Sequence, residues 1–222
     1  MQGRWFLIVA AGLALTGYGR DRADQWIDAT DLPALVLPTS QEVTDRHGDL
    51  LRAYTVADGR WRLAASNGKI DPFFVQLLLT YEDRRFYSHD GVDARALLRA
   101  TWQAVSTGRI ASGGSTLTMQ VAGFLDPALA PRGAARTLGQ KWDQAQMALQ
   151  LERQWSKAEI LEAYLNLAPY RGELSGLAAA AYGLFGKSPS GLDGAEAALL
   201  VALLRGTNAT AAVVATRACG VA

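Results

Sequence analysis

Apolar residues over most of the chain recur at the three- and four-residue spacing that is typical of amphipathic helices. This pattern starts at Asp71, where Pro72 suits the first turn of a helix that runs to Tyr81. Further along, GLAAAAYGLFGK predicts an alanine-rich helix that allows close packing and is stopped by Gly186 and Pro189. We therefore expect a mainly α-helical fold.

Two of the later helices carry complete start signals. The segment SKAE, residues 156–159, has the form of a capping box and precedes an apolar stripe. The segment DGAE, residues 193–196, repeats this pattern before AALLVALL, which ends at Gly206. We therefore interpret Glu159 and Glu196 as helix caps rather than as chemical groups.

The pattern differs before the first helix. The segment VTDRHGDLLRAYTVADGRWRL has two short alternating runs, broken by HG at 47–48 and DG at 58–59, and predicts a small β hairpin. Residues 20–42 are mixed in polarity and contain Pro33 and Pro38. They are expected to form an extended stalk, because proline disfavours helix in the residue before it.

The start of the chain is an apolar block over residues 5–16, preceded by Arg4 and followed by charges from Arg20. A block of about 10 to 14 residues suits the core of a signal peptide, whereas a spanning helix needs about 20. Adding residues 17–19 gives a marginal span, and no clear small-x-small cleavage site follows. Residues 1–19 are therefore a membrane anchor or a signal segment, and we favour the anchor.

The length and composition of the chain exclude several classes of function. With 222 residues, the chain is long enough for one good core and too short for two full enzymes. The net charge of +1 provides no general field for nucleic acid, so no nucleic-acid partner is expected. Cys219 is the only cysteine, which excludes a disulfide framework and a thiolate zinc site. Only His47 and His89 could supply imidazole ligands, so no metal site is expected.

The strongest chemical candidate is Glu82, which with Asp83 follows directly on the apolar run FFVQLLLT. An acid beside arginines, here Arg84 and Arg85, is usually a surface ion pair worth less than about 1 kcal/mol. The flanking aromatic residues are Tyr81, Phe86 and Tyr87. Because such rings would exclude water from part of the cluster, Glu82 also fits the role of a general base.

A second candidate is ASGGSTLTMQ, residues 111–120. It could be merely a tight turn with a helix N-cap. Alternatively, its glycines would let backbone amides approach a ligand, while Ser115, Thr116, Thr118 and Gln120 would hydrogen-bond a phosphate or a sugar. Both interpretations stay open at this point.

Five segments in order carry a family resemblance; they are EDRRFYSHDGVD, GGSTLTMQ, LERQWSKAEILEAYLN, AAAAYGLFGKSP and LDGAEAALLVALL. Together they resemble the motifs of the peptidoglycan glycosyltransferase domain (glycosyltransferase family 51) of penicillin-binding proteins. The likeness covers roughly Val43 to Asn208. The hairpin segment and ILEAYLNLAPY look closest to the penicillin-binding protein 1C branch.

The resemblance implies a mainly α, lysozyme-like domain with a small N-terminal β hairpin and an N-terminal membrane anchor. We expect an anchor or signal segment over 1–19, a stalk over 20–42, the glycosyltransferase domain over 43–208 and a C-terminal tail over 209–222. The expected location is the bacterial inner membrane, with a single pass and the catalytic domain on the periplasmic or outer face.

The implied activity is polymerisation of lipid II into glycan strands, by inverting transfer with release of undecaprenyl pyrophosphate. Glu82 falls on the family's general base. The positions that match the family's cleft and substrate contacts are Asp83, Phe86, His89, Ser115, Thr116, Gln120, Lys141, Gln144 and Lys187. The implied partners are lipid II, the growing glycan chain, the membrane and other proteins of cell-wall synthesis.

The sequence departs from the family at several positions. Gln144 stands where a glutamate is usual, Gly123 and Gln140 replace basic residues, and Arg171 replaces a glycine. Residues that could restore positive charge are Arg136, Lys187 and Arg205. No cofactor is required by the resemblance, and a divalent cation such as Mg²⁺ is left open, because an amide at 144 binds such an ion poorly.

Two alternatives to the glycosyltransferase are kept. A lytic transglycosylase or muramidase on a related fold would use Glu82 as an acid toward glycan strands. A catalytically weak scaffold that binds lipid II is suggested by Gly123, Gln140 and Arg171. No transpeptidase motif is found in these 222 residues, so penicillin binding is not expected of them.

Overall fold

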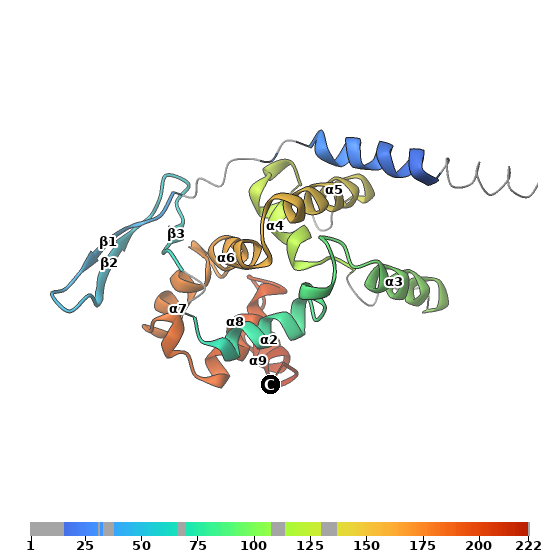
Figure 1. The fold of residues 1–222 in the computed structure, drawn as a ribbon. Coiled ribbons are helices and arrows are strands. Elements are labelled where there is room, and N and C mark those ends of the chain that lie inside the picture. Colours follow the sequence, from blue (N-terminus) through green and yellow to red (C-terminus); the bar gives the residue numbers. More distant parts are fainter. Residues whose placement is uncertain are drawn as a thin grey trace, which may run out of the picture.

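The fold is given by a computed structural model, which describes residues 16–30, 32, 38–65, 70–107, 114–129 and 137–221. Most of these residues are helical, as expected (Figure 1). The helices are α2 (Pro72–Glu82), α3 (Ala94–Thr107), α4 (Leu117–Leu125), α5 (Leu138–Gln154), α6 (Lys157–Leu167), α7 (Leu177–Phe185), α8 (Gly194–Leu204) and α9 (Ala211–Cys219). Short 3₁₀ helices cover Phe86–Ser88, Pro127–Leu129 and Pro189–Gly191.

The helices fall into two groups joined through α6. In the first group, α4 packs against both α5 and α6. In the second group, α8 packs against α2, α7 and α9. Helix α6 also contacts α7 and so connects the groups (Figure 1). The C-terminal end of α2 lies near both, which matters for the site described below.

The core consists largely of α6, α7 and α8. The first five residues of α7, Leu177–Ala181, are buried, and alanine side chains there let the neighbouring helices approach closely. Helix α8 is buried on nearly all sides through Ala197, Leu200 and Val201. Large apolar side chains from α2, α4 and α6, among them Phe74 and Tyr164, complete the core.

Local sequence signals explain where these helices begin and end. Asp71 caps α2 by accepting a hydrogen bond from the amide of Phe73, with Pro72 in the first turn. Both predicted capping boxes are present, at 156–159 before α6 and at 193–196 before α8. Gly186 ends α7 in the left-handed conformation, as its sequence predicts.

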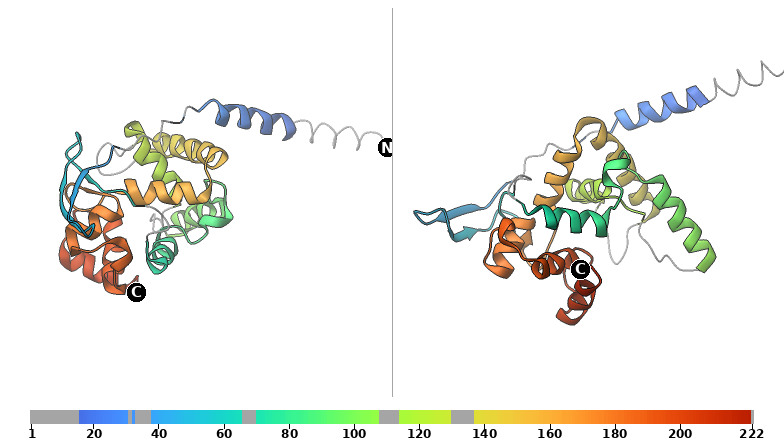
Figure 2. Two further views of the ribbon diagram at one scale, coloured as in Figure 1. Left: turned by 60° about the vertical axis from the view of Figure 1, so that its left-hand side comes forward. Right: turned by 60° about the horizontal axis from the view of Figure 1, so that its bottom comes forward.

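The predicted hairpin is also confirmed. Strand β1 (Gln41–Thr44) pairs antiparallel with β2 (Leu50–Tyr54), and the hairpin projects from the helical body (Figure 2). The next turn leads into β3 (Trp61–Arg62), which pairs in parallel with β4 (Leu174–Ser175) before α7. This short pairing fastens the hairpin segment to the second group of helices.

Helix α3 is the exception to this close packing. It projects away from both helical groups in Figure 1 and in the right-hand view of Figure 2. Its N-terminus is fixed by Asp93, which accepts hydrogen bonds from the amides of Arg95 and Ala96. Leu98, Trp102 and Val105 are 71%, 74% and 78% exposed, so one apolar face of α3 is uncovered by the described residues.

The stalk expectation needs a correction. Residues 16–28 form a helix, so residues 20–28 are helical rather than extended. No proline or glycine interrupts residues 20–28, and the ion pair between Arg20 and Asp24 has the i,i+4 spacing that supports a helix. Arg153 on α5 pairs with Asp24 and Asp28, which holds this helix against the domain.

The structure describes part of the expected anchor and most of the expected C-terminal tail. Residues 1–15 of the expected anchor lie outside the described residues, and none of the helices that are described is both long and apolar enough to span a bilayer. Within residues 209–222, expected as a tail, α9 packs on α8 with Val214 and Ala218 buried.

The close approach at Gly91 generates a stability prediction. Gly91 has a φ of +83°, and a Cβ there would lie 2.5 Å from the carbonyl oxygen of Ala148 on α5. Gly91→Ala should therefore lower the free energy of unfolding by at least about 3 kcal/mol, through left-handed strain plus overpacking. Chemical denaturation would measure the change.

Gly48→Ala is the matched control for that substitution. Gly48 has a φ of +89°, but the space that an added methyl group would occupy is open, so only the backbone strain of about 1 to 2 kcal/mol should be lost. Equal losses for the two variants would show that contact with α5 does not constrain the segment at Gly91.

Candidate active site

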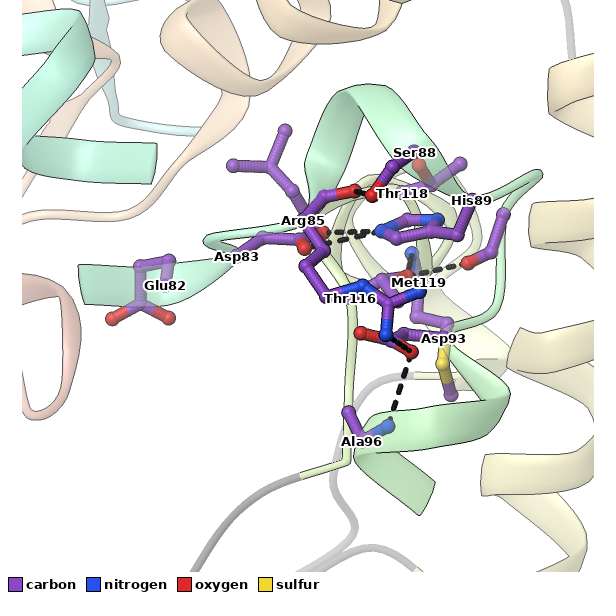
Figure 3. Close-up of polar contacts among 12 residues, drawn as sticks. Glu82, Asp83, Arg85, Ser88, His89, Asp93, Ala96, Thr116, Thr118 and Met119 are labelled. Atoms are coloured by element: carbon purple, nitrogen blue, oxygen red, sulfur yellow. Dashed lines mark hydrogen bonds and ion pairs between the residues drawn. The ribbon is translucent and has the colours of Figure 1, made fainter. Parts of the chain in front are cut away.

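The acid pair at the end of α2 is split between two surroundings. Glu82 is the last residue of α2 and Asp83 is its C-cap. Figure 3 shows Glu82 standing apart from the polar cluster into which Asp83 points. Because the helix ends between them, two adjacent carboxylates serve different tasks.

Glu82 is held by groups from other helices. The side-chain amide of Gln120 on α4 donates a hydrogen bond to Oε2 of Glu82 at 3.1 Å. The hydroxyl of Tyr164 on α6 donates in turn to Oε1 of Gln120, in a longer contact of 3.4 Å. Since Tyr164 donates to the oxygen of this amide, the NH₂ group of Gln120 is directed at Glu82.

The second oxygen of Glu82 has no such partner. Oε1 is buried and accepts no hydrogen bond from any residue that the structure describes. Its nearest ionic partner is Arg205 at the end of α8, with Nε 3.8 Å away. The Glu82 side chain is 11% exposed and that of Arg205 is 56% exposed, so Oε1 lies just below the surface. A buried carboxylate oxygen without a donor is costly, and such groups mark candidate functional sites.

Two buried phenols lie close enough to feel the charge of Glu82. Burial raises the pKa of the Tyr164 hydroxyl well above its usual range, and the negative charge of Glu82 raises it further. Burial raises the pKa of Tyr170 as well, with Glu82 again the second cause. Both phenols are therefore protonated at neutral pH, so Tyr164 can act as the donor to Gln120.

Asp83 fastens the first motif to the second. Its carboxylate contacts Nε2 of His89 at 3.0 and 3.1 Å and accepts a hydrogen bond from the amide of Leu117 at 2.9 Å. Thr116, the N-cap of α4, donates to the carbonyl of Gly91 at 2.5 Å. Asp83, His89 and Thr116 are buried and engaged within the protein, so here they position the motifs (Figure 3).

Arg85 and Phe86, which follow Glu82 closely in sequence, have their partners elsewhere in the structure. Arg85 pairs with Asp93 at 3.5 Å, Phe86 is buried beneath Lys157, and Tyr87 is exposed. Only Tyr81 belongs to the site, because the guanidinium of Arg205 lies over its ring at 4.4 Å. The arginine at ion-pair distance from Glu82 is thus Arg205, while Arg85 pairs with Asp93.

The other predicted site residues are spread over the fold. Ser115 is half-buried directly before the N-cap of α4, and Lys141 is exposed on α5. Lys187 pairs with Glu196 at 2.6 Å, in the first turn of α8. Glu196 precedes Arg205 by nine residues, so the partner of Lys187 lies about 13 Å along the helix axis from Arg205.

The family departures have structural explanations where they are described. Gly123 is buried within α4, and Gln140 completes a capping box with Thr137 at the start of α5. Arg171 donates hydrogen bonds to the carbonyls of Thr207 and Ala209. Arg136 lies outside the described residues.

The described residues form no site in which protein side chains alone would hold a divalent metal. Gln144 is buried and its amide donates to the carbonyl of Leu129 at 3.4 Å. Among the residues that the structure describes, no cluster of three acidic, histidine or cysteine side chains could hold an ion.

Sequence reasoning missed three contributors to this site. They are Tyr164, Tyr170 and the placement of Arg205 near Glu82. These groups come close to Glu82 only because α6 and α8 pack against α2 and α4. Tyr164 looks like an ordinary core residue in its apolar stripe, so only its hydroxyl hinted at another role. Arg205 was considered as a source of charge, without a place in space.

Fold and site together define a mainly helical domain with one shielded carboxylate, positioned by an amide and facing a half-exposed arginine. The family model described as Transglycosylase matches residues 47–220, and the chain belongs to this family. It is 41% identical over 204 residues to penicillin-binding protein 1C of Escherichia coli, a match that covers 91% of this chain and 25% of that protein.

Other relatives agree with this assignment. Penicillin-binding protein 1A of Escherichia coli is 32% identical over 208 residues, which is 90% of this chain and 23% of the relative. Penicillin-binding protein 4 of Bacillus subtilis is 33% identical over 181 residues, or 81% of this chain and 28% of the relative. The chain thus spans about a quarter of the length of these relatives.

The raised pKa values of the buried phenols predict an alkaline instability. Above about pH 10 the unfolded chain loses phenolic protons that the folded state keeps, so the free energy of unfolding should fall as pH rises. Tyr170→Phe removes one such proton and should flatten that fall. Urea unfolding between about pH 9 and pH 11 would measure both slopes.

Tyr87→Phe is the control, since it makes the same chemical change at an exposed position. A slope for Tyr170→Phe that equals the wild-type slope would contradict the burial of this phenol beside Glu82.

Proposed function

We propose that this chain is a peptidoglycan glycosyltransferase that polymerises lipid II, with Glu82 as its general base. The observation that carries the proposal is the buried Oε1 of Glu82, which has no hydrogen-bond donor among the described residues. A sugar hydroxyl would provide that donor, because it is neutral, compact and acidic enough to share its proton with a carboxylate. Family membership supports the same chemistry.

The reaction follows from this arrangement. Oε1 of Glu82 accepts the proton of the incoming 4-hydroxyl, whose oxygen attacks the anomeric carbon of the growing chain. The bond from that carbon to the diphosphate breaks with inversion, and the diphosphate leaves with its electron pair. Because a diphosphate leaves without a proton, one carboxylate suffices, whereas most glycoside hydrolases use two. The engagement of Asp83 with His89 and Leu117 is consistent with a single working acid.

Gln120 has a defined part in this step. It donates to Oε2, so it orients Glu82 and leaves Oε1 as the proton acceptor. Its position beside Glu82 also keeps it close enough to contact the sugar, as the family resemblance implies. The same proposal includes a lysozyme-like arrangement of the domain. It also includes lipid II and the growing glycan chain as the binding partners.

We also propose that the domain works at a membrane surface, the bacterial inner membrane, as its lipid-linked substrate requires. The uncovered face of α3 supports this, because Leu98, Trp102 and Val105 lie along one side of a helix that also carries arginine, glutamine, serine and threonine. A helix of this kind can lie in the interface with its apolar side among the lipids. Tryptophan is also enriched at the headgroup level.

Polymerisation of labelled lipid II by the whole chain tests the function. Glu82→Gln keeps the shape of residue 82 but cannot take a proton, so the rate should fall at least about 100-fold. Gel separation of the glycan products would measure it. Glu42→Gln, an exposed glutamate on β1, should keep the wild-type rate.

Three outcomes would count against the assignment. Equal rates for Glu82→Gln and wild type would remove Glu82 as the base. Binding of lipid II without turnover by the wild-type chain would favour a scaffold. Release of soluble fragments from intact sacculi would favour a lytic enzyme.

The membrane role has its own test. Leu98→Asp/Trp102→Asp should lower turnover of lipid II in phospholipid vesicles about tenfold, because two apolar side chains no longer enter the interface. Turnover of a water-soluble, short-chain lipid II analogue should stay within about twofold of wild type.

Leu51→Asp is the control for that variant, since it places one aspartate on an exposed leucine of the hairpin, away from α3. Equal losses on the vesicle and soluble substrates would indicate damage to the domain and would contradict a membrane role for α3.

A further inference from the structure

Arg205 is, within the described part of the chain, the only cation at ion-pair distance from Glu82. It is the C-cap of α8, and its guanidinium lies over the ring of Tyr81, the residue before Glu82. Its backbone amide donates to the carbonyl of Leu203, but its side chain donates no hydrogen bond to any described residue and is more than half exposed. The ion pair between Arg205 and Glu82 therefore contributes little to the stability of the fold. Stability alone does not explain why Arg205 lies beside Oε1.

The loop that follows Arg205 is held both by its own turns and by Arg171, a residue outside the loop. Its own turns are closed by hydrogen bonds from Gly206 to Leu203 and from Ala209 to Gly206. Arg171 then binds this loop with two further donors, Nε to the carbonyl of Thr207 and Nη2 to the carbonyl of Ala209. One guanidinium thus fixes two points of the chain directly after Arg205.

Arg171 is well placed to link this loop to the site. It follows Tyr170, whose buried ring lies close enough to Glu82 to respond to its charge. Arg171 therefore joins the loop after Arg205 to a segment that Tyr170 anchors in the core. The fork of N–H donors on an arginine suits such a two-point contact, which a glycine at this position could not make.

We propose that Arg171 is a positioning residue that acts through Arg205: it holds the loop between α8 and α9 so that Arg205 lies over Tyr81 and faces Oε1 of Glu82. This inference rests on the proposed function. It assigns a role to Arg171, which departs from the family pattern. In this arrangement Arg205 keeps the Glu82 carboxylate in the orientation that accepts the sugar proton.

A double-mutant cycle on lipid II polymerisation tests the link. Arg205→Ala should lower kcat about tenfold while KM changes less than about twofold, because orientation of the base is lost and substrate affinity is kept. Arg171→Ala should lower kcat about threefold, and it should have no further effect in the Arg205→Ala background. Arg205→Lys should recover most of the loss, because it keeps the charge.

Controls separate this role from a structural one. Arg46→Ala removes an exposed cation from the turn of the hairpin and should keep the wild-type kcat. Thermal unfolding of each variant reports stability independently of activity. Arg171→Gln, whose amide can keep one of the two loop contacts, replaces Arg171→Ala in the cycle if the alanine variant does not fold.

Two results would overturn the inference alone, provided that wild type polymerises and Glu82→Gln does not. One is a wild-type kcat for Arg205→Ala. The other is a double variant whose loss is the product of the two single losses, since Arg171 would then act independently of Arg205. A wild-type chain without polymerisation would overturn the proposed function and this inference together.

Discussion

The residues around the end of α2 must accommodate two adjacent carboxylates with opposite requirements. One is fully hydrogen-bonded within the protein, and the other keeps one oxygen without a donor among the described residues. Asp83 is fully engaged by His89 and by the amide of Leu117, so it joins the first motif to the start of α4. Glu82 has one oxygen held by Gln120 and one left without a donor among the described residues. If α2 ended one residue earlier or later, this division would be lost. In the proposed reaction, the position of this helix end therefore decides which carboxylate can act as the base.

The packing of the two helical groups supports that division. Glu82 receives Gln120 from α4, and Arg205 from the end of α8, so the site forms only where the groups meet. Burial keeps Tyr164 protonated, and its hydroxyl fixes which end of the Gln120 amide faces the acid. A neutral buried phenol, an amide and a half-exposed guanidinium thus hold one carboxylate in a defined direction. In the proposed reaction, this arrangement preorganises Glu82 as the base rather than adding to stability.

Much of this architecture could be predicted from the sequence, because its signals are local. The caps at Asp71, Ser156 and Asp193 and the glycine at 186 each act within one helical turn. The ordered motifs likewise identified Glu82. The helix over 16–28 was missed because prolines further on suggested an extended segment. The companions of Glu82 were missed for another reason: Tyr164 and Arg205 are 82 and 123 residues away in sequence, and only tertiary packing brings them to it.

The most direct test of this account is an experimental structure of the Glu82→Gln chain with a lipid-linked disaccharide bound. We expect the 4-hydroxyl of the acceptor sugar within about 3 Å of the side-chain atom that replaces Oε1, on the side where Arg205 lies. Gln120 should still contact the other atom of residue 82. A disaccharide bound elsewhere on the domain, or a residue 82 whose unpaired atom is enclosed by protein with no sugar beside it, would contradict the central claim.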